Sequence, residues 1–343
     1  MIVILEPKST KENLMHVTEM LEERGYAVHV TEGVEQTIVG AVGVPADPAR
    51  KAEVMEQFES LPYVDRVVPV TKPYKIVNRQ FRQSPTIVDV RGVRIGDPTF
   101  TVVMAGPCTV ESETQLRDSA RAVKEAGAHI LRGGAYKPST SPYSFHGHGE
   151  AALKMLAAAR DEFGMPIITE VLDVRDVELV CRYADILQIG TRNMANYSLL
   201  TEVGKTGTPV MLKRGMSATI EEWLQAAEYI ASQGNKDIIL CERGIRTFET
   251  YTRNTFDLNA IPAVKELSHL PIIADPSHAT GKSSLVNAVS RGAIAAGADG
   301  LIVEVHPNPE KALKDGAQSL LPEAFMRLMT DLAPVSAAVG RRM

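Results

Sequence analysis

The sequence predicts a (β/α)8 TIM barrel preceded by a small ferredoxin-like βαββαβ domain. Three observations support this fold class. The chain has 343 residues, which corresponds to about two domains of roughly 150 residues each. Residues 1–71 alternate between strand and helix patterns in the order of a ferredoxin-like domain. Beyond residue 100, a short apolar strand and an amphipathic helix follow one another eight times, as a barrel of this type requires.

The composition is that of a globular protein and excludes several function classes. With 44% hydrophobic and 23% charged residues, the chain is neither disordered nor collagen-like. A net charge of -5 offers no basic stripe for nucleic acid. No apolar run reaches the roughly 18 residues of a membrane span. The apolar residues 2–5 are too short for a signal peptide and the three cysteines do not suggest a disulfide framework, so we expect a cytoplasmic protein.

In the first domain, apolar residues at strand or helix spacing define six elements. Leu14, Val17 and Leu21 recur at helical spacing, and Gly25 ends that helix. We expect strands at residues 2–5, 27–31, 36–44 and 64–70, a turn at Gly33, and helices at 10–24 and from Pro48 onward. Residues 72–85 are polar and basic without a clear period, so we predict a linker there, followed by a catalytic barrel at 86–343.

Eight short apolar runs, beyond a candidate hairpin at residues 87–95, are expected to form the barrel strands. They span residues 101–105, 129–132, 166–171, 185–189, 209–213, 237–241, 271–274 and 300–305. A helical stretch of about a dozen residues is expected after each run. A doubly wound sheet is the alternative, but it would leave too many strands without the signature of a switch point.

Barrel enzymes carry catalytic residues at the C-terminal ends of their strands, and here those ends include a set of metal-type ligands. Cys108 follows the first predicted strand, His278 the seventh and Glu304 lies on the eighth, with Asp315 in the next loop. The first and eighth strands are neighbours in a closed barrel, so these side chains should meet. Singly, Cys108 is more often a buried thiol and His278 a hydrogen-bonded residue. Together, the four favour manganese, iron, zinc, cobalt or copper over magnesium or calcium.

A second group at the strand ends is cationic. Its members are Arg132, Lys137, Arg192, Lys213 and Arg243. Five cations on one rim of an acidic chain would repel one another unless an anion lies between them. We therefore expect a ligand that carries a phosphate and a carboxylate, because arginine binds either group in bidentate fashion.

Two local patterns suggest other activities. Residues 280–283 (Thr-Gly-Lys-Ser) imitate the end of a phosphate-binding P-loop, but the first glycine of that motif would fall on Pro276. Lys213 on a barrel strand is also compatible with the Schiff-base lysine of a metal-independent aldolase. That hypothesis leaves the metal-type residues unused.

Longer motifs at the strand ends carry a family resemblance. They are residues 105–108 (Ala-Gly-Pro-Cys), 132–138 (Arg-Gly-Gly-Ala-Tyr-Lys-Pro), 140–145 (Thr-Ser-Pro-Tyr-Ser-Phe), 190–193 (Gly-Thr-Arg-Asn), 275–278 (Asp-Pro-Ser-His) and 303–306 (Val-Glu-Val-His). With these motifs the chain resembles 3-deoxy-D-arabino-heptulosonate 7-phosphate (DAHP) synthase, in the form with an N-terminal ferredoxin-like regulatory domain. The resemblance covers essentially the whole chain.

The resemblance implies an aldol-type condensation of phosphoenolpyruvate with erythrose 4-phosphate, the first step of the shikimate pathway to aromatic amino acids. It implies that the four metal-type residues bind a divalent metal, which acts as a Lewis acid on the aldehyde, and that the five cations hold phosphoenolpyruvate. Thr140 and Ser141 would join in substrate binding. Lys137, Glu170 and His306 are the candidate catalytic residues, with Lys137 supplying a proton to the new hydroxyl and Glu170 handling the attacking water. Tyrosine or phenylalanine would inhibit a homotetramer through its N-terminal domains.

One position departs from the family pattern. Where the family usually has Lys-Pro-Arg-Thr, this chain has Lys-Pro-Ser-Thr, with Ser139 in place of the arginine that grips the aldose phosphate. A neutral hydroxyl replaces a charged fork at a loss of about 1–3 kcal/mol. This departure keeps open a catalytically weakened barrel that acts as an amino-acid-responsive regulator. Within the enzyme class, the alternative is a sibling synthase that uses arabinose 5-phosphate, but its loop usually lacks the Pro-x-Thr-Ser-Pro run found here.

Overall fold

The structure, a computed structural model, describes residues 1–32, 36–43, 48–69, 73–138 and 141–343. These residues form two compact units, Met1–Pro73 and Tyr74–Met343. Ser139, Thr140 and the predicted turn at Gly33 lie outside the described residues. No helix in the described part of the chain is both long and apolar enough to cross a membrane.

The first unit contains the strands and helices in the order that the sequence predicts. They are β1 (Ile2–Leu5), α1 (Lys11–Glu22), β2 (Ala27–Glu32), β3 (Thr37–Val42), α2 (Pro48–Glu59) and β4 (Val64–Val68). The sheet order is β2-β3-β1-β4 with antiparallel neighbours, which confirms the ferredoxin-like fold. Thr10 caps α1 through a capping box with Asn13. Leu5, Leu21 and Phe58 are fully buried in a core of this unit.

The second unit is built on a closed barrel of parallel strands, as predicted. The strands are β7 (Val102–Gly106), β8 (Ile130–Arg132), β9 (Ile167–Glu170), β10 (Ile186–Ile189), β11 (Val210–Lys213), β12 (Ile238–Glu242), β13 (Ile272–Ala274) and β14 (Gly300–Glu304). Their ends differ from the predicted ends by at most one residue. The barrel closes where β14 pairs with β7, which sets Glu304 beside Gly106.

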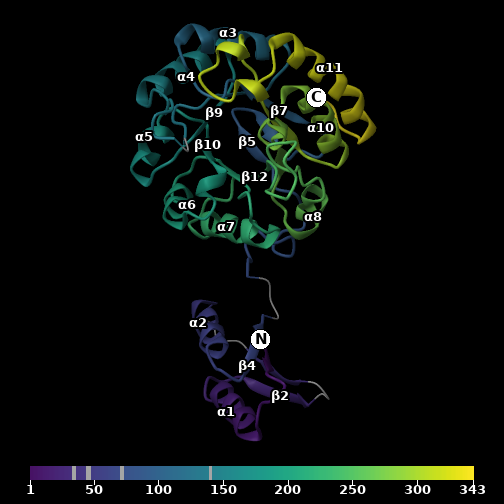
Figure 1. The fold of residues 1–343 in the computed structure, drawn as a ribbon. Coiled ribbons are helices and arrows are strands. Elements are labelled where there is room, and N and C mark those ends of the chain that lie inside the picture. Colours follow the sequence, from purple (N-terminus) through teal and green to yellow (C-terminus); the bar gives the residue numbers. More distant parts are fainter. Residues whose placement is uncertain (33–35, 44–47, 70–72, 139–140) are drawn as a thin grey trace. The chain divides into compact units, whose positions relative to one another are not determined.

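Helices surround the barrel in Figure 1. They are α3 (Glu113–Glu125), α4 (Glu150–Phe163), α5 (Val177–Cys181), α6 (Tyr197–Gly204), α7 (Ile220–Ser232), α8 (Ala260–Leu267), α9 (Pro276–Thr280), α10 (Ser283–Ala295) and α11 (Pro322–Ala338). Short 3-10 helices also occur at η1 (Val174–Asp176), η2 (Thr191–Asn193), η3 (Pro309–Lys311) and η4 (Gly316–Gln318).

The expectation of about a dozen helical residues after every strand is wrong for three units. Helices α5, α6 and α8 have 5, 8 and 8 residues. In the first two units η1 and η2 take up part of the connection, and in the third a loop runs between β12 and α8. Amphipathic spacing does not distinguish these irregular turns from a longer helix.

The barrel interior is packed at the N-terminal ends of the strands. Met104, Ile168 and Ile302 belong to one buried cluster with Val88 and Ile95 of the hairpin β5 (Val88–Val90) and β6 (Val93–Ile95). The hairpin therefore closes this end of the barrel. Because the interior is filled there, a ligand site belongs at the opposite end, where the strands finish.

Residues 74–85, which the sequence analysis assigns to a linker, contact the barrel. The carboxylate of Glu228 accepts hydrogen bonds from the backbone N–H groups of Ile76 and Val77, at 2.9 and 3.0 Å. Ser268 donates to the carbonyl of Val77, and the side chains of Tyr74 and Val77 are buried. Because isolated residues make these contacts, the segment shows neither helix nor strand periodicity. Its packing against the barrel therefore could not be predicted from the sequence.

Candidate active site

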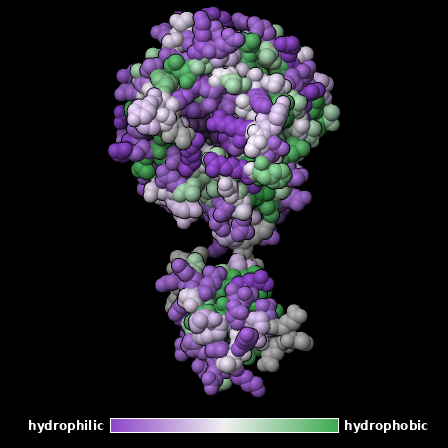
Figure 2. All heavy atoms as spheres, viewed as in Figure 1, coloured by the Kyte–Doolittle hydropathy of each residue, from purple (hydrophilic) through white to green (hydrophobic). Residues whose placement is uncertain are grey.

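A cavity opens at the C-terminal ends of the barrel strands. Among the described residues, its lining includes the cations Arg132, Lys137, Arg192, Lys213, Arg243, Arg253 and Lys314. Hydrophilic residues gather around the hollow in the middle of the barrel face in Figure 2. The sequence-predicted Ser141, Glu170, His278 and Asp315 line the same cavity. The structure thus brings most of the predicted site residues together.

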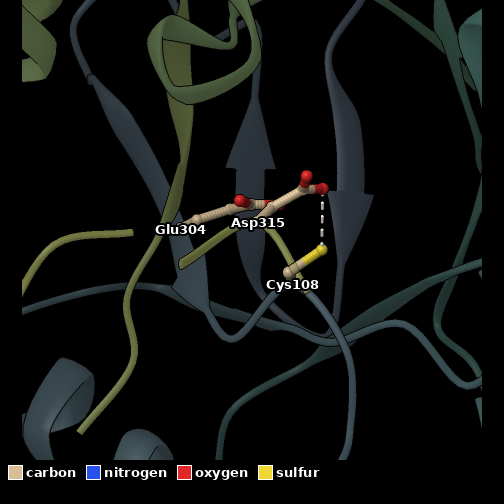
Figure 3. A group of neighbouring side chains, drawn as sticks. All are labelled: Cys108, Glu304 and Asp315. Atoms are coloured by element: carbon tan, nitrogen blue, oxygen red, sulfur yellow. Dashed lines mark hydrogen bonds between the residues drawn. The ribbon is translucent and has the colours of Figure 1, made fainter. Parts of the chain in front are cut away.

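Three metal-type side chains form a compact cluster beside this cavity. Cys108, Glu304 and Asp315 each offer one ligand atom within 4.8 Å of the others. In Figure 3 the thiol of Cys108 points toward the carboxylate of Asp315, and its Sγ donates to Asp315 Oδ2 at 3.3 Å. The cluster forms because β7 and β14 are neighbours and the chain after β14 returns over them.

Unusual backbone conformations present two of these ligands. Gly106 has φ +149°, and a Cβ there would overlap the carbonyl oxygen of Arg132, so only glycine fits two residues before Cys108. Asp315 has φ +52° and ψ 28°, a left-handed conformation that residues other than glycine seldom adopt. Strain of this kind persists where the surroundings enforce it and often marks a functional site.

The fourth predicted ligand, His278, lies next to the cluster but is not part of it. Its Nε2 atom is 3.4 Å from Glu304 Oε1, and its Nδ1 atom is 2.7 Å from Asp275 Oδ2. Burial lowers the pKa of His278 to about 4, although the carboxylates nearby favour its charged form. The imidazole is therefore neutral near pH 7 and has a lone pair for a metal.

The charge states of the cluster suit a divalent cation. Burial alone would raise the pKa of Glu304, but His278, Arg132 and Lys137 lower it to about 2. Burial would also raise the pKa of Asp315, but Lys137, His278 and Arg253 together hold it well below its usual range. Burial, and then Glu304, raise the pKa of the Cys108 thiol. Two carboxylates are thus ionised, and a metal that binds here would displace the thiol proton.

Three of the five predicted cations are paired with acids. Arg132 Nη1 is 2.6 Å from Glu304 Oε1, Lys137 Nζ is 3.2 Å from Asp315 Oδ2, and Lys213 Nζ is 2.5 Å from Asp275 Oδ2. These contacts partly offset the charges of the cations while no ligand is bound. A Schiff-base lysine is typically desolvated among apolar groups or set beside another cation, whereas the amine of Lys213 is held by a buried carboxylate, which argues against the metal-independent aldolase.

Arg243 has a different environment. It is buried, and its one hydrogen bond within the described residues goes to the carbonyl of Gly244 at 3.4 Å. Burial without an acidic partner lowers the pKa of Arg243. A buried guanidinium that lacks a carboxylate and lines a cavity is arranged to receive an anion.

Two cations that the sequence reasoning missed also line the cavity. Arg253 lies in the loop between β12 and α8, where it donates to Asp315 Oδ1 at 3.3 Å and to Gln318 Oε1 at 2.9 Å. Lys314 precedes Asp315 in the chain. Neither residue follows a strand directly, so the strand-end rule does not find them. The adjacency of Lys314 to a predicted ligand is the one signal that the sequence offers.

The remaining predicted residues differ in their relation to the cavity. Glu170 ends β9, accepts a hydrogen bond from Gln188 Nε2 at 3.2 Å, and has a pKa raised by burial. His306 lies instead beside Glu111, with 3.4 Å between His306 Nε2 and Glu111 Oε2, and it is not among the residues that line the cavity. A direct role for His306 at the substrates has no support from this placement.

Comparisons with known proteins agree with this geometry. Residues 1–72 match the DAHP synthase ferredoxin-like domain, and residues 74–337 match the DAHP synthetase I family. A phospho-2-dehydro-3-deoxyheptonate aldolase of Thermotoga maritima is 49% identical over 340 residues, which cover 99% of each chain. A 2-dehydro-3-deoxyphosphooctonate aldolase of Syntrophotalea carbinolica is 32% identical over 74% of this chain and 98% of its own length.

Solved structures give the same assignment. The crystal structure of the Thermotoga maritima aldolase, a DAHP synthase, superposes with a TM-score of 0.93 at 48% identity, covering 99% of this chain and 97% of that one. A truncated form of the DAHP synthase from the same organism has a TM-score of 0.73 at 49% identity, covering 78% of this chain and 98% of its own. The chain therefore belongs to the DAHP synthetase I family of enzymes and carries a DAHP synthase ferredoxin-like domain.

Proposed function

We propose that this chain condenses phosphoenolpyruvate with erythrose 4-phosphate to give DAHP and phosphate, the first step of the shikimate pathway. One observation carries the proposal: at the barrel mouth, a cavity lined by cations adjoins the cluster of Cys108, Glu304 and Asp315. The 49% identity with the Thermotoga aldolase over the whole chain supports the same activity.

The cations would hold phosphoenolpyruvate, which carries a phosphate and a carboxylate. Arg243 is buried without an acid among the described residues, so an anion would supply its missing partner. Arg192 and Lys213 reach the same cavity from the ends of neighbouring strands β10 and β11. Phosphate between these groups would form charge-assisted hydrogen bonds, which are about twice as strong as neutral ones.

A divalent metal such as manganese, iron, zinc or cobalt would be held by Cys108, His278, Glu304 and Asp315. The donor set fits, because two carboxylates are ionised, the imidazole is neutral and the thiol is close to both carboxylates. When bound, the metal supplies a Lewis acid that polarises the aldehyde oxygen of erythrose 4-phosphate.

Residues of the chain would carry the proton transfers. Bond formation between C3 of phosphoenolpyruvate and the aldehyde carbon leaves an oxygen that needs a proton. Burial disfavours the charged form of Lys137, but the carboxylates around it, Glu304 and then Asp315, raise its pKa and keep it protonated as a donor. Glu170, whose pKa burial raises, would take a proton from the water that adds at C2. Phosphate then leaves with cleavage of the C–O bond, while the cations stabilise the developing charge.

The direct test incubates the purified full-length chain, reloaded with Mn²⁺, with phosphoenolpyruvate and erythrose 4-phosphate. Phosphate release should equal the formation of a seven-carbon sugar acid phosphate identified by mass spectrometry. A metal-loaded, folded protein that releases no phosphate would refute the enzyme hypothesis and leave the weakened regulatory barrel.

We further propose that residues 1–71 regulate the barrel and that tyrosine or phenylalanine is the inhibitor. The first unit has its own core, and its described residues contain no cluster of metal-type side chains. Removing residues 1–73 should therefore leave turnover and abolish inhibition. A full-length enzyme whose rate ignores both amino acids would contradict this proposal.

A further inference from the structure

The loop between β14 and α11 carries two residues of the cavity, Lys314 and Asp315, yet no buried apolar side chain anchors it. None of residues 307–317, all of which the structure describes, is buried. Leu313 is their one large hydrophobic residue, and it is 54% exposed. Polar contacts must therefore determine where this loop lies.

Glu111 supplies one of these contacts from the segment that follows Cys108. Its Oε1 atom accepts a hydrogen bond from the backbone N–H of Leu313 at 2.8 Å. Among the described residues, this is the one hydrogen bond that joins residues 309–313 to a segment outside their own loop. The Oε2 atom of Glu111 is 3.4 Å from His306 Nε2, at the base of the same loop. The Glu111 side chain is 11% exposed, so water competes little with these contacts.

The backbone around Glu111 is itself held at the barrel mouth. The N–H of Val110 donates to the carbonyl of Gly134 at 3.0 Å, and the N–H of Glu111 donates to Gln115 Oε1 at 3.2 Å. The carbonyl of Glu111 accepts a hydrogen bond from His148 Nε2 at 3.0 Å. The carboxylate of Glu111 is therefore a fixed acceptor rather than a mobile surface group.

The position of the loop decides where the carboxylate of Asp315 lies. The left-handed backbone of Asp315 persists only where surrounding contacts enforce it. On one side of Asp315, Gln318 Nε2 donates to Glu304 Oε2 at 2.7 Å and holds the loop. On the other side, the bond to Glu111 holds it. Glu111 is three residues beyond Cys108, whose thiol contacts Asp315 in Figure 3.

We propose that Glu111 is a positioning residue that ties the loop carrying Asp315 to the segment carrying Cys108. The tie sets these two side chains at the separation that a single divalent cation needs. Without it, the upstream half of the loop has no hydrogen bond to hold it over the end of β7. The inference rests on the proposed function, because it takes Cys108 and Asp315 as ligands of one metal.

Two variants break this bond from opposite sides. Glu111→Ala removes the acceptor. Leu313→Pro removes the donor, since proline has no backbone N–H, and the preceding Ala312 has ψ 132°, which suits a residue before proline. If both act through one bond, the double variant should be no worse than either single variant. Glu111→Gln keeps an oxygen acceptor of the same reach and should restore the parent behaviour.

Two measurements on the metal-free full-length chain follow the loop. Amide hydrogen exchange in the peptide covering residues 307–319 should be about fivefold faster in Glu111→Ala and in Leu313→Pro. The dissociation constant for Zn²⁺, measured by competition with a chromogenic chelator, should rise about tenfold in the same two variants. In Glu111→Gln, both quantities should stay within about threefold of the parent.

Glu228→Ala is the matched control. Glu228 also accepts hydrogen bonds from backbone N–H groups, those of Ile76 and Val77, and it is not among the described residues that line the cavity. Its loss should loosen residues 74–85 and change neither the exchange of the loop nor the affinity for Zn²⁺. The control thus separates a general loss of packing from the loss of this particular tie.

Parental exchange rates in the loop of both Glu111→Ala and Leu313→Pro would overturn the proposal. Losses of Zn²⁺ affinity that add up in the double variant would overturn it equally, because the two residues would then act separately. If Glu111→Ala does not fold, Leu313→Pro decides by the same two readouts. Amide exchange requires neither metal nor turnover, so its failure is distinguishable from an absence of DAHP formation.

Discussion

Replacing Gly190 with alanine tests the role of Glu170 by moving its carboxylate without removing it. A Cβ at position 190 would lie 2.9 Å from Glu170 Cδ and closer still to Oε1, whereas ordinary contact begins at 3.4 Å. The backbone of Gly190 has φ -68° and ψ 159°, which alanine adopts without strain. The whole steric cost therefore falls on the carboxylate, whose Oε1 atom must move by more than 1 Å to restore ordinary contact.

A displacement of this size is large for a catalytic group. A misplacement of about 1 Å costs roughly 100-fold in rate, equivalent to about 2.7 kcal/mol in the barrier. The free energy of unfolding should fall by only about 1 kcal/mol, because among the described residues the hydrogen bond from Gln188 is the one that the Glu170 carboxylate accepts, and a carboxylate that stays in the cavity keeps its attraction to Lys137. We therefore expect kcat to fall about 100-fold while the unfolding midpoint changes little.

Steady-state phosphate release and urea unfolding measure these two quantities on the same preparation. Gly207→Ala is the control, because Gly207 has no atom within 4 Å of its ideal Cβ and no positive φ. Glu170→Gln, which keeps the shape and removes the charge, should lose as much activity as Gly190→Ala. A Gly190→Ala enzyme that keeps kcat within twofold of the parent would refute the role assigned to Glu170.

Three further predictions concern the metal, the second substrate and acid stability. Chelation should abolish activity, and a divalent transition metal should restore it. Cys108→Ala should remain inactive after it is reloaded with metal. Undiminished turnover in the metal-stripped enzyme or in Cys108→Ala would exclude a metal centre. Ser139→Arg should lower the KM for erythrose 4-phosphate about tenfold and leave the KM for phosphoenolpyruvate unchanged. The reason is that a gain of about 1.4 kcal/mol in aldose binding corresponds to a factor of ten. An unchanged KM for the aldose would mean that other cations complete the phosphate site. Burial lowers the pKa of His269, which contacts Thr86 and Ile76, so the unfolded chain binds its proton more readily. Urea stability should therefore fall as pH drops below about 6.5, and less steeply in His269→Gln; equal slopes would show that His269 does not contribute.

The barrel strands are predictable because each is a short apolar run that is buried on both faces. All residues of β7, β12 and β14 are buried, so their sequences form continuous apolar segments. The rule that sites follow the strands then places Cys108 and Glu304 correctly at the mouth. The prediction of the strands and the prediction of these two site residues both depend on local sequence alone.

Other features depend on contacts between distant segments. Arg253 reaches the cavity through a loop that no periodic pattern marks, and Asp315 presents its carboxylate through a left-handed backbone. Asp275 stands in the same short motif as His278, but its contact with Lys213 appears only when β11 and β13 lie in one barrel. These relations are set by tertiary packing, which neighbouring residues in the sequence do not encode.

We propose above all that this cavity joins phosphoenolpyruvate to a four-carbon aldose phosphate. The most direct measurement is the ratio of kcat/KM for erythrose 4-phosphate to that for arabinose 5-phosphate, taken on one metal-loaded preparation with saturating phosphoenolpyruvate. We predict a ratio of at least about 100, with DAHP as the product. A ratio at or below one would contradict the account and assign the chain to the synthase that uses the five-carbon sugar.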